Sequence, residues 1–117
     1  MGVKAIGAGA VQGLHAQAKP PVYVVTEIDV TDLNAYIKNY VPLAQATIKS
    51  AGGTRLAAGQ NITVFEGAPP KVRVAINRFD SLEQVKAWRN SAEYKEARKI
   101  GDKYATFRSF AIEGVPQ

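Results

Sequence analysis

The chain contains no cysteine and a single histidine, His15, among its 117 residues. The lack of cysteine excludes disulfides, thiolate metal sites and cysteine nucleophiles. His15 falls in the N-terminal leader described below, so the rest of the chain offers no imidazole to a Ser-His-Asp triad, a metal ion or a haem iron. We therefore expect no metal site and no organic cofactor.

Long hydrophobic runs are also missing. No stretch approaches the roughly 20 apolar residues that span a bilayer, so we expect no membrane insertion of the mature protein. Apolar residues make up 46% of the chain and charged residues 21%, as in an ordinary globular domain. A domain of this size buries only about two-thirds of the surface of its unfolded chain, so pairing with a second copy would add useful burial.

The net charge of +5 favours an anionic partner, but the charge is not concentrated in one place. Basic and acidic residues alternate through the most charged stretch, Glu83–Lys103, as they do on a solvated helix face. Because no basic stripe or nucleic-acid-binding motif accompanies the charge, we expect a small anion rather than a nucleic acid as partner.

The first 18 residues have the composition of a leader. Lys4 precedes a short apolar stretch of small residues, Ala5–Val11, and the segment ends in Ala16-Gln17-Ala18. A basic start, an apolar middle and an A-x-A ending are the parts of a secretory signal. We expect residues 1–18 to be the remnant of such a signal, which places the protein in the periplasm or outside the cell; a flexible leader on a cytoplasmic protein is the alternative. Residues 19–117 form the single domain.

The first half of the domain is expected to be a strand followed by a helix. Val22–Val30 is rich in β-branched residues and follows two prolines, so it predicts a strand. Thr31 is placed to cap a helix that runs to about Ser50, with a kink at Pro42. Gly52-Gly53 supplies the left-handed residue that ends the helix.

The second half repeats this order. Ser81 and Gln84 have capping-box spacing and open a second helix, which bends at Asn90 and continues after a second cap at Ser91. The remaining strand-like segments are Arg55–Ala58, Asn61–Glu66, Lys71–Phe79 and Thr106–Glu113. The pattern predicts an α+β fold of the ferredoxin-like βαββαβ type, an antiparallel sheet with helices on one face.

Alternation along the strands predicts two different sheet faces. Val22, Val24 and Ile28 with Val74 and Ile76 would form an aliphatic face that suits the helices. The opposite face would carry Tyr23, Glu27, Arg73, Asn77, Phe79 and Phe107. Aromatic side chains are unusual on a solvated face, so we expect this face to pack against the same face of a second copy, as in a dimeric α+β barrel.

The sequence also resembles a known family. The carrying motifs are Phe79-Asp80-Ser81, Ala87-Trp88, Ser91 and Glu93-Tyr94, together with Gly52-Gly53, Glu66-Gly67 and Glu113-Gly114. They look like the signature of family 1330 of the domains of unknown function, over about Val22–Gly114. The resemblance implies the dimeric α+β barrel superfamily, which includes cofactor-free monooxygenases, lactone isomerases, haem-handling enzymes and stress proteins. It implies a fold and no particular activity.

Three charged residues are candidates for catalysis. Glu66 precedes a Gly-Ala-Pro-Pro turn and is a candidate base or ligand anchor, although a solvated turn residue would look the same. Arg73 and Glu27 are predicted on one sheet face, where they would bind a small carboxylate or act as acid–base groups. The alternative is that Arg73 and Glu27 pair with each other or across the dimer.

Aromatic and polar residues on the helices are candidates for ligand binding. Tyr94 and Arg98 lie four residues apart and therefore share one helix face, and Tyr36 and Tyr40 form a similar pair on the first helix. Aromatic residues at helical spacing are also typical of a core. The candidate ligand-binding residues are Tyr36, Tyr40, Asn77, Trp88, Tyr94 and Arg98.

Two functions remain open at this point. The first is a homodimer that binds or converts a small, partly apolar or anionic molecule without metal or organic cofactor, with Glu66 or Glu27 moving a proton and Arg73 steadying negative charge. The second is a non-catalytic dimeric module for stress response or assembly. Whether the protein is an enzyme is left open. A pocket of about 300 Å³ or more with convergent polar groups favours the first function.

Overall fold

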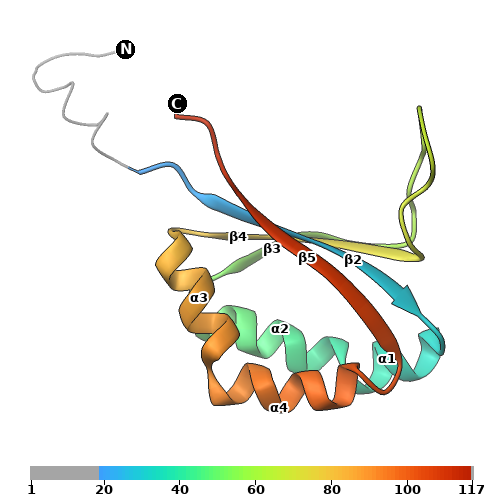
Figure 1. Ribbon diagram of the computed structural model, residues 1–117. Helices are drawn as coiled ribbons and strands as arrows, with labels where there is room; N and C mark the ends of the chain where they lie inside the picture. Colours follow the sequence, from blue (N-terminus) through green and yellow to red (C-terminus); the bar gives the residue numbers. More distant parts are fainter. Residues whose placement is uncertain (1–18, 117) are drawn as a thin grey trace, which may run out of the picture.

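The computed structural model describes residues 19–116 as one four-stranded antiparallel sheet in the order β3-β4-β2-β5 with four helices on one face (Figure 1). The predicted signal, residues 1–18, lies outside the described residues. The strands are β2 Val22–Val30, β3 Thr54–Gly59, β4 Arg73–Phe79 and β5 Ala105–Glu113, and the helices are α1 Leu33–Asn39, α2 Val41–Ser50, α3 Leu82–Asn90 and α4 Ala92–Gly101. This architecture confirms the predicted ferredoxin-like α+β fold.

The first helical segment is two helices rather than one kinked helix. Asp32, not Thr31, is the N-cap: its side chain accepts a hydrogen bond from the Ala35 amide at 3.1 Å. The helix is interrupted at Tyr40, which ends α1 and begins α2, so Pro42 lies in the first turn of α2. A proline there costs little because the first amides of a helix have no intrahelical acceptor.

The second helical segment follows the predicted caps. The Ser81 hydroxyl accepts from the Gln84 amide, and the Ser91 hydroxyl accepts from the Tyr94 amide, each at 3.1 Å. The Gln84 side chain reaches back one residue further than a capping box requires and accepts from the Asp80 amide at 2.7 Å. Ser91 thus ends α3 and begins α4, which sets the bend that presents Tyr94 to the sheet.

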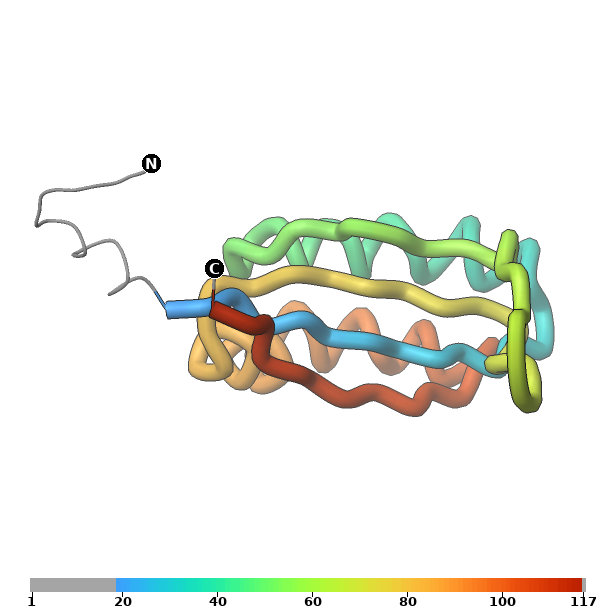
Figure 2. The backbone as a smooth tube through the Cα atoms, turned by 90° about the horizontal axis from the view of Figure 1, so that it is seen from above, coloured from blue at the N-terminus to red at the C-terminus, as the bar shows by residue number. Residues whose placement is uncertain are grey.

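The predicted strand Asn61–Glu66 is wrong. Residues 60–70, which we call the arm, lie in no strand and project from the sheet between β3 and β4. Figures 1 and 2 place the arm at the end of the sheet opposite the two termini of the described chain, rising on the side away from the helices. The Gly67 backbone has φ 79°, a left-handed conformation that favours glycine.

The predicted faces hold for β2 but are wrong for β4 and β5. In the sheet register Val22 is opposite Phe79, and Ile28 is opposite both Arg73 and Phe107. Directly opposed residues share a face, and Val22 and Ile28 are buried under the helices. Phe79, fully buried against Trp88, and Phe107 therefore face this chain's own helices, together with Arg73 and Asn77.

The sheet face away from the helices, which we call the outer face, is more apolar than predicted. It holds Val74 and Ile76, which the alternation had placed in the core. Phe110 and Ile112 of the edge strand β5 are 44% and 58% exposed there. No helix of the described chain covers this face (Figure 1). The apolar residues of the outer face are Tyr23, Val25, Val74, Ile76, Phe110 and Ile112.

One buried polar contact ties the two helical segments together. The Trp88 indole donates to the Thr47 hydroxyl at 3.0 Å, and this hydroxyl donates to the Ala44 carbonyl at 2.8 Å. Thr47→Val keeps the shape but leaves a buried indole N–H without an acceptor, so we expect the free energy of unfolding in urea to fall by about 1–3 kcal/mol. Ser50→Ala, at the exposed end of the same helix, should stay within about 0.5 kcal/mol of wild type.

Candidate anion-binding cavity

A small cavity lies between the helices and the sheet, and all four strands contribute to its wall. Its volume is about 30 Å³. That is room for about two water molecules or a group of similar size, such as a carboxylate. It is well below the ~300 Å³ of a pocket that encloses a whole ligand. A cavity of this size admits the head of a ligand rather than the whole molecule.

Arg73 is the most unusual residue of the wall. Its side chain enters from β4, is only 7% exposed, and places the guanidinium 5.7 Å from the centre of the Tyr36 ring. Nη1 donates to the Gln60 side chain at 2.8 Å, whereas Nε has no hydrogen-bond partner in the described part of the chain. Buried charged groups are normally paired, so a buried guanidinium with a free donor is costly.

Arg55 brings a second guanidinium to the same cavity from β3. Its Nε donates to Asn77 Oδ1 at 3.2 Å, across the pair of residues that the sheet register places opposite each other. Burial and the positive charge of Arg73 lower the pKa of Arg55. Within residues 19–116 neither arginine forms an ion pair with a carboxylate. Two like charges therefore share one half-buried site without a counter-ion.

Tyr36 and Tyr40 form the helix side of the wall, with ring centres 5.2 Å apart. Both side chains are buried, and burial raises the pKa of both phenols, although the nearby positive charge of Arg73 offsets part of the rise for Tyr36. Both hydroxyls therefore keep their protons at neutral pH and can donate. Neither hydroxyl is hydrogen-bonded to another residue in the described part of the chain.

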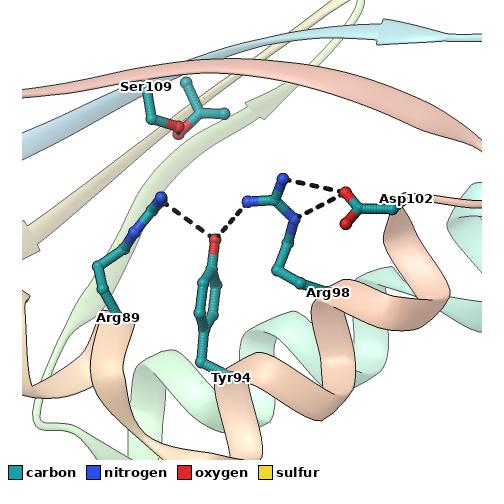
Figure 3. A network of polar contacts seen from close by, with 6 residues as sticks. Arg89, Tyr94, Arg98, Asp102 and Ser109 are labelled. Atoms are coloured by element: carbon teal, nitrogen blue, oxygen red, sulfur yellow. Dashed lines mark hydrogen bonds and ion pairs between the residues drawn. The ribbon is translucent and has the colours of Figure 1, made fainter.

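Tyr94 completes the wall from α4 and is held by two guanidinium groups (Figure 3). Its oxygen accepts from Arg98 Nη1 at 2.9 Å and from Arg89 Nη1 at 3.1 Å. The phenol oxygen has only two lone pairs, so its remaining polar group is the proton, which is free to donate. The Tyr94 ring packs against Trp88 with the ring centres 4.6 Å apart and the ring planes tilted by 56°, which fixes its direction.

Arg98 is anchored on both sides. Its Nε and Nη2 donate to Asp102 Oδ1 at 3.1 and 3.0 Å, and its guanidinium lies 3.9 Å from the centre of the Phe107 ring. Burial lowers the pKa of Arg98, but the hydrogen bonds and charges of Tyr94 and Asp102 raise it by more than burial lowers it, so the net shift is upward. Arg98 positions Tyr94 and does not itself line the cavity.

The structure brings some predicted site residues together and separates others. Arg73, Tyr36, Tyr40, Asn77, Trp88 and Tyr94 all line the cavity. Glu66 is exposed and belongs to the arm, a segment that rises on the side of the sheet away from the helices (Figure 1). Glu27 lies on the outer face and pairs with Arg108 at 3.0 Å, so the prediction that Glu27 and Arg73 share a face is wrong.

Arg55 is the charged residue of the cavity wall that the sequence analysis missed. Its signal was a single basic residue in a short apolar strand directly after Gly52-Gly53. That position becomes meaningful only once the register places Arg55 opposite Asn77. Arg89 was also missed, because Arg89 and Tyr94 lie on different helices on either side of Ser91 and helical spacing does not make them neighbours.

The cavity is thus rich in donors and poor in acceptors. Donors converge from Arg55, Arg73, Tyr36, Tyr40 and Tyr94, and no acidic side chain of residues 19–116 lines the wall. This arrangement suits an oxyanion, which accepts several hydrogen bonds at once. Across the described residues no cluster of metal-binding side chains occurs, and no helix is long and apolar enough to cross a membrane.

Comparison with known proteins identifies a family and a fold. The model of the family described as a domain of unknown function, DUF1330, matches residues 21–115. No curated protein matches the chain. A crystal structure of a protein of unknown function from Rhodopseudomonas palustris superposes with a TM-score of 0.61 at 15% identity, covering 90% of this chain and 94% of that one.

Two further structures share the fold. SnoaB, a cofactor-independent oxygenase from Streptomyces nogalater, has a TM-score of 0.62 at 10% identity, covering 84% of this chain and 96% of that one. A dimeric protein of unknown function with a ferredoxin-like fold from Bacteroides fragilis has a TM-score of 0.58 at 16% identity, covering 80% of this chain and 96% of that one. At these identities the likeness is one of fold.

Proposed function

The chain belongs to the DUF1330 family, and from that premise and the geometry of its cavity we propose that it is a homodimer that binds the head of a small, partly apolar anion between sheet and helices. No metal or organic cofactor takes part in this proposal. The fold likeness to a protein described as dimeric and the uncovered apolar outer face support the dimer. The donor-rich cavity supports the ligand.

Arg73 carries the proposal. A guanidinium that is 7% exposed, has a free Nε and lies beside a second uncompensated guanidinium is unfavourable in the empty protein. A carboxylate head supplies the missing negative charge and accepts from both arginines, and hydrogen bonds to charged groups contribute roughly 1.5–3 kcal/mol each. The cost that the fold bears without ligand is recovered when the ligand binds.

The aromatic wall selects the body of the ligand. Tyr40 and Trp88 line the buried part of the cavity, whereas Phe107 is only partly buried and offers apolar surface to the body of a ligand whose head is bound. The Thr26 and Ser109 hydroxyls, 2.9 Å apart and exposed, also belong to this wall. A short apolar chain or an aromatic ring next to the carboxylate would therefore pack against aromatic surface while its head reaches the arginines.

If the protein also converts its ligand, the tyrosines rather than Glu66 or Glu27 are the groups in reach of the head. The Tyr36 ring contacts the Arg73 guanidinium, and Tyr94 offers a proton from an oxygen fixed by two arginines. SnoaB, described as a cofactor-independent oxygenase, shares this fold, which supports a proposal of chemistry without a cofactor for this chain.

The second candidate function, a non-catalytic dimeric module, is favoured by one observation. The cavity volume of about 30 Å³ is too small for a whole ligand. In that function Arg73 would only support the fold. The two candidates differ in whether small acids bind, which a direct measurement decides.

Binding of matched acids and amides tests the proposal. Isothermal calorimetry with benzoate and hexanoate should show one site per chain, and benzamide and hexanamide, which keep the body but lose the charge, should bind at least about tenfold more weakly. Equal binding of acid and amide would sink the anion site. Absence of binding by every acid in a wider thermal-shift panel would favour the non-catalytic module.

The same titration predicts an unusual pH profile. The cavity wall of the described chain holds arginines and tyrosines but no histidine or acid, and the pKa values of Tyr36 and Tyr40 are raised. Arginine stays charged and these phenols stay neutral, so the affinity for benzoate should be flat between about pH 6 and 9 and fall only when the ligand itself is protonated near pH 4. A step in affinity between about pH 6 and 8 would point to a titrating group outside this cavity wall.

A further inference from the structure

The arm, residues 60–70, is apolar, and nothing else in residues 19–116 covers it. Phe65 is 91% exposed, Val64 43% and Ile62 38%. An exposed phenylalanine on a projecting loop exposes apolar surface to water at a cost, and neighbouring apolar residues enlarge that surface. The arm is nevertheless ordered at its base, where the Ile62 amide donates to the Gln60 carbonyl at 2.9 Å and the Gln60 side chain holds Arg73.

The direction of the arm indicates what covers it. It rises from one end of the sheet on the side of the outer face (Figures 1 and 2). A second copy packed on the outer face would occupy the space beside the arm. The arm and the apolar outer face would then form one continuous contact surface.

The charges of the outer face fit a copy of itself. In a two-fold interface a patch meets the same patch, so uncompensated charges would repel. In this chain Glu27 pairs with Arg108 at 3.0 Å, and Asp29 lies 4.0 Å from Lys71. Arg78 pairs with Asp80 at 3.2 Å. These pairs bring no unmatched charge to the partner.

We propose that the arm embraces the second copy of the dimer and buries Phe65 against it. The proposal rests on the dimer proposed above and adds a part that the sheet alone does not supply. Because the base of the arm also holds Arg73 through Gln60, the same segment joins the contact between subunits to the wall of the anion cavity.

Thiol labelling tests the arm, because the chain has no cysteine of its own. A Phe65→Cys variant should react with a thiol reagent at least about tenfold more slowly than the same cysteine in an Ile76→Asp background, where a charge at the centre of the outer face separates the copies. Ala92→Cys, at the exposed start of α4, serves as the control and should react at the same rate in both backgrounds.

A second measurement does not depend on labelling. Phe65→Gln should raise the dissociation constant of the dimer at least about tenfold, whereas Leu43→Gln, which alters a 43% exposed side chain on the helix side, should change it less than about twofold. Suppose that wild type is a dimer, that the thiol introduced by Phe65→Cys reacts at the same rate in both backgrounds, and that Phe65→Gln has no effect. These results would overturn the proposed contact of the arm and leave the dimer in place. A wild type that is monomeric by light scattering overturns the arm and the proposed dimer together.

Discussion

Arg73→Met is expected to make the ligand-free protein more stable while it removes anion binding. Methionine keeps the apolar stem of the side chain and ends about where Nε lies, so the wall loses only the volume of the guanidinium group. The change removes a buried guanidinium with a free Nε and relieves its repulsion with Arg55. It gives up one bond to Gln60 and a cation–π contact at 5.7 Å. We expect a net gain of about 1 kcal/mol in the free energy of unfolding.

The effect on binding should have the opposite sign. Loss of a forked donor to a carboxylate removes about 3 kcal/mol, so the affinity for benzoate should fall at least about 100-fold. Stability is measured by urea unfolding and binding by calorimetry. Opposite signs for the two quantities are typical of a residue retained for function and not for folding.

Two controls separate charge from geometry. Arg73→Lys keeps the charge but loses the planar fork, so we expect weaker binding without the gain in stability. Lys95→Met removes an exposed charge on α4 and should change neither quantity. If Arg73→Met instead costs about 2 kcal/mol or more and leaves benzoate binding intact, Arg73 is a structural residue and the anion site is misplaced; that threshold is about the cost of breaking a buried polar contact.

The sequence predicted the elements of the fold better than the faces of the strands. Helix caps depend on neighbours in the chain, so Ser81 and Ser91 could be identified from spacing alone. The faces of β4 could not, because both of its alternating sets contain apolar residues. Val74 and Ile76 suit a core as well as Ala75 and Phe79 do. The choice depends on the register with β2, which no local pattern encodes.

The site shows the same division between local and long-range information. Tyr36 with Tyr40 and Tyr94 with Arg98 were predicted as pairs because helical spacing makes them neighbours. Arg73 was named as an anion ligand but on the wrong face, and Glu66 was named although the arm carries it away from the cavity. The encounter of Arg55 with Arg73 joins two strands separated by the arm, so only the folded sheet reveals it.

The strand faces found in the structure support a dimer more strongly than the predicted faces did. The prediction needed Phe79 and Phe107 at a subunit interface, and both lie under this chain's own helices. The outer face instead holds Val74 and Ile76 beside Tyr23 and Phe110, an apolar surface on which Glu27 is paired with Arg108. Such a surface is closer to the apolar core of an obligate interface than the mixed face first expected.

Ile76→Asp is the decisive test of that surface. Ile76 lies in the central strand β4, between β3 and β2 on the outer face, and packs against no helix. A two-fold interface would bury the new carboxylate twice, without partners, so we expect the dissociation constant of the dimer to rise at least about 1000-fold, equivalent to roughly 4 kcal/mol. Light scattering at about 10 µM should give a dimer for wild type and a monomer for the variant.

The controls for this variant follow from the two faces of the molecule. Leu43→Asp places the same charge on α2, where 43% of the leucine is already exposed, and should remain a dimer. Circular dichroism of Ile76→Asp should match wild type, because the side chain it replaces lies outside both core clusters of the chain. If the variant stays dimeric, the interface does not lie on the outer face. The paired charges and apolar centre of the outer face, and the exposed arm beside it, would then lack the partner proposed to cover them.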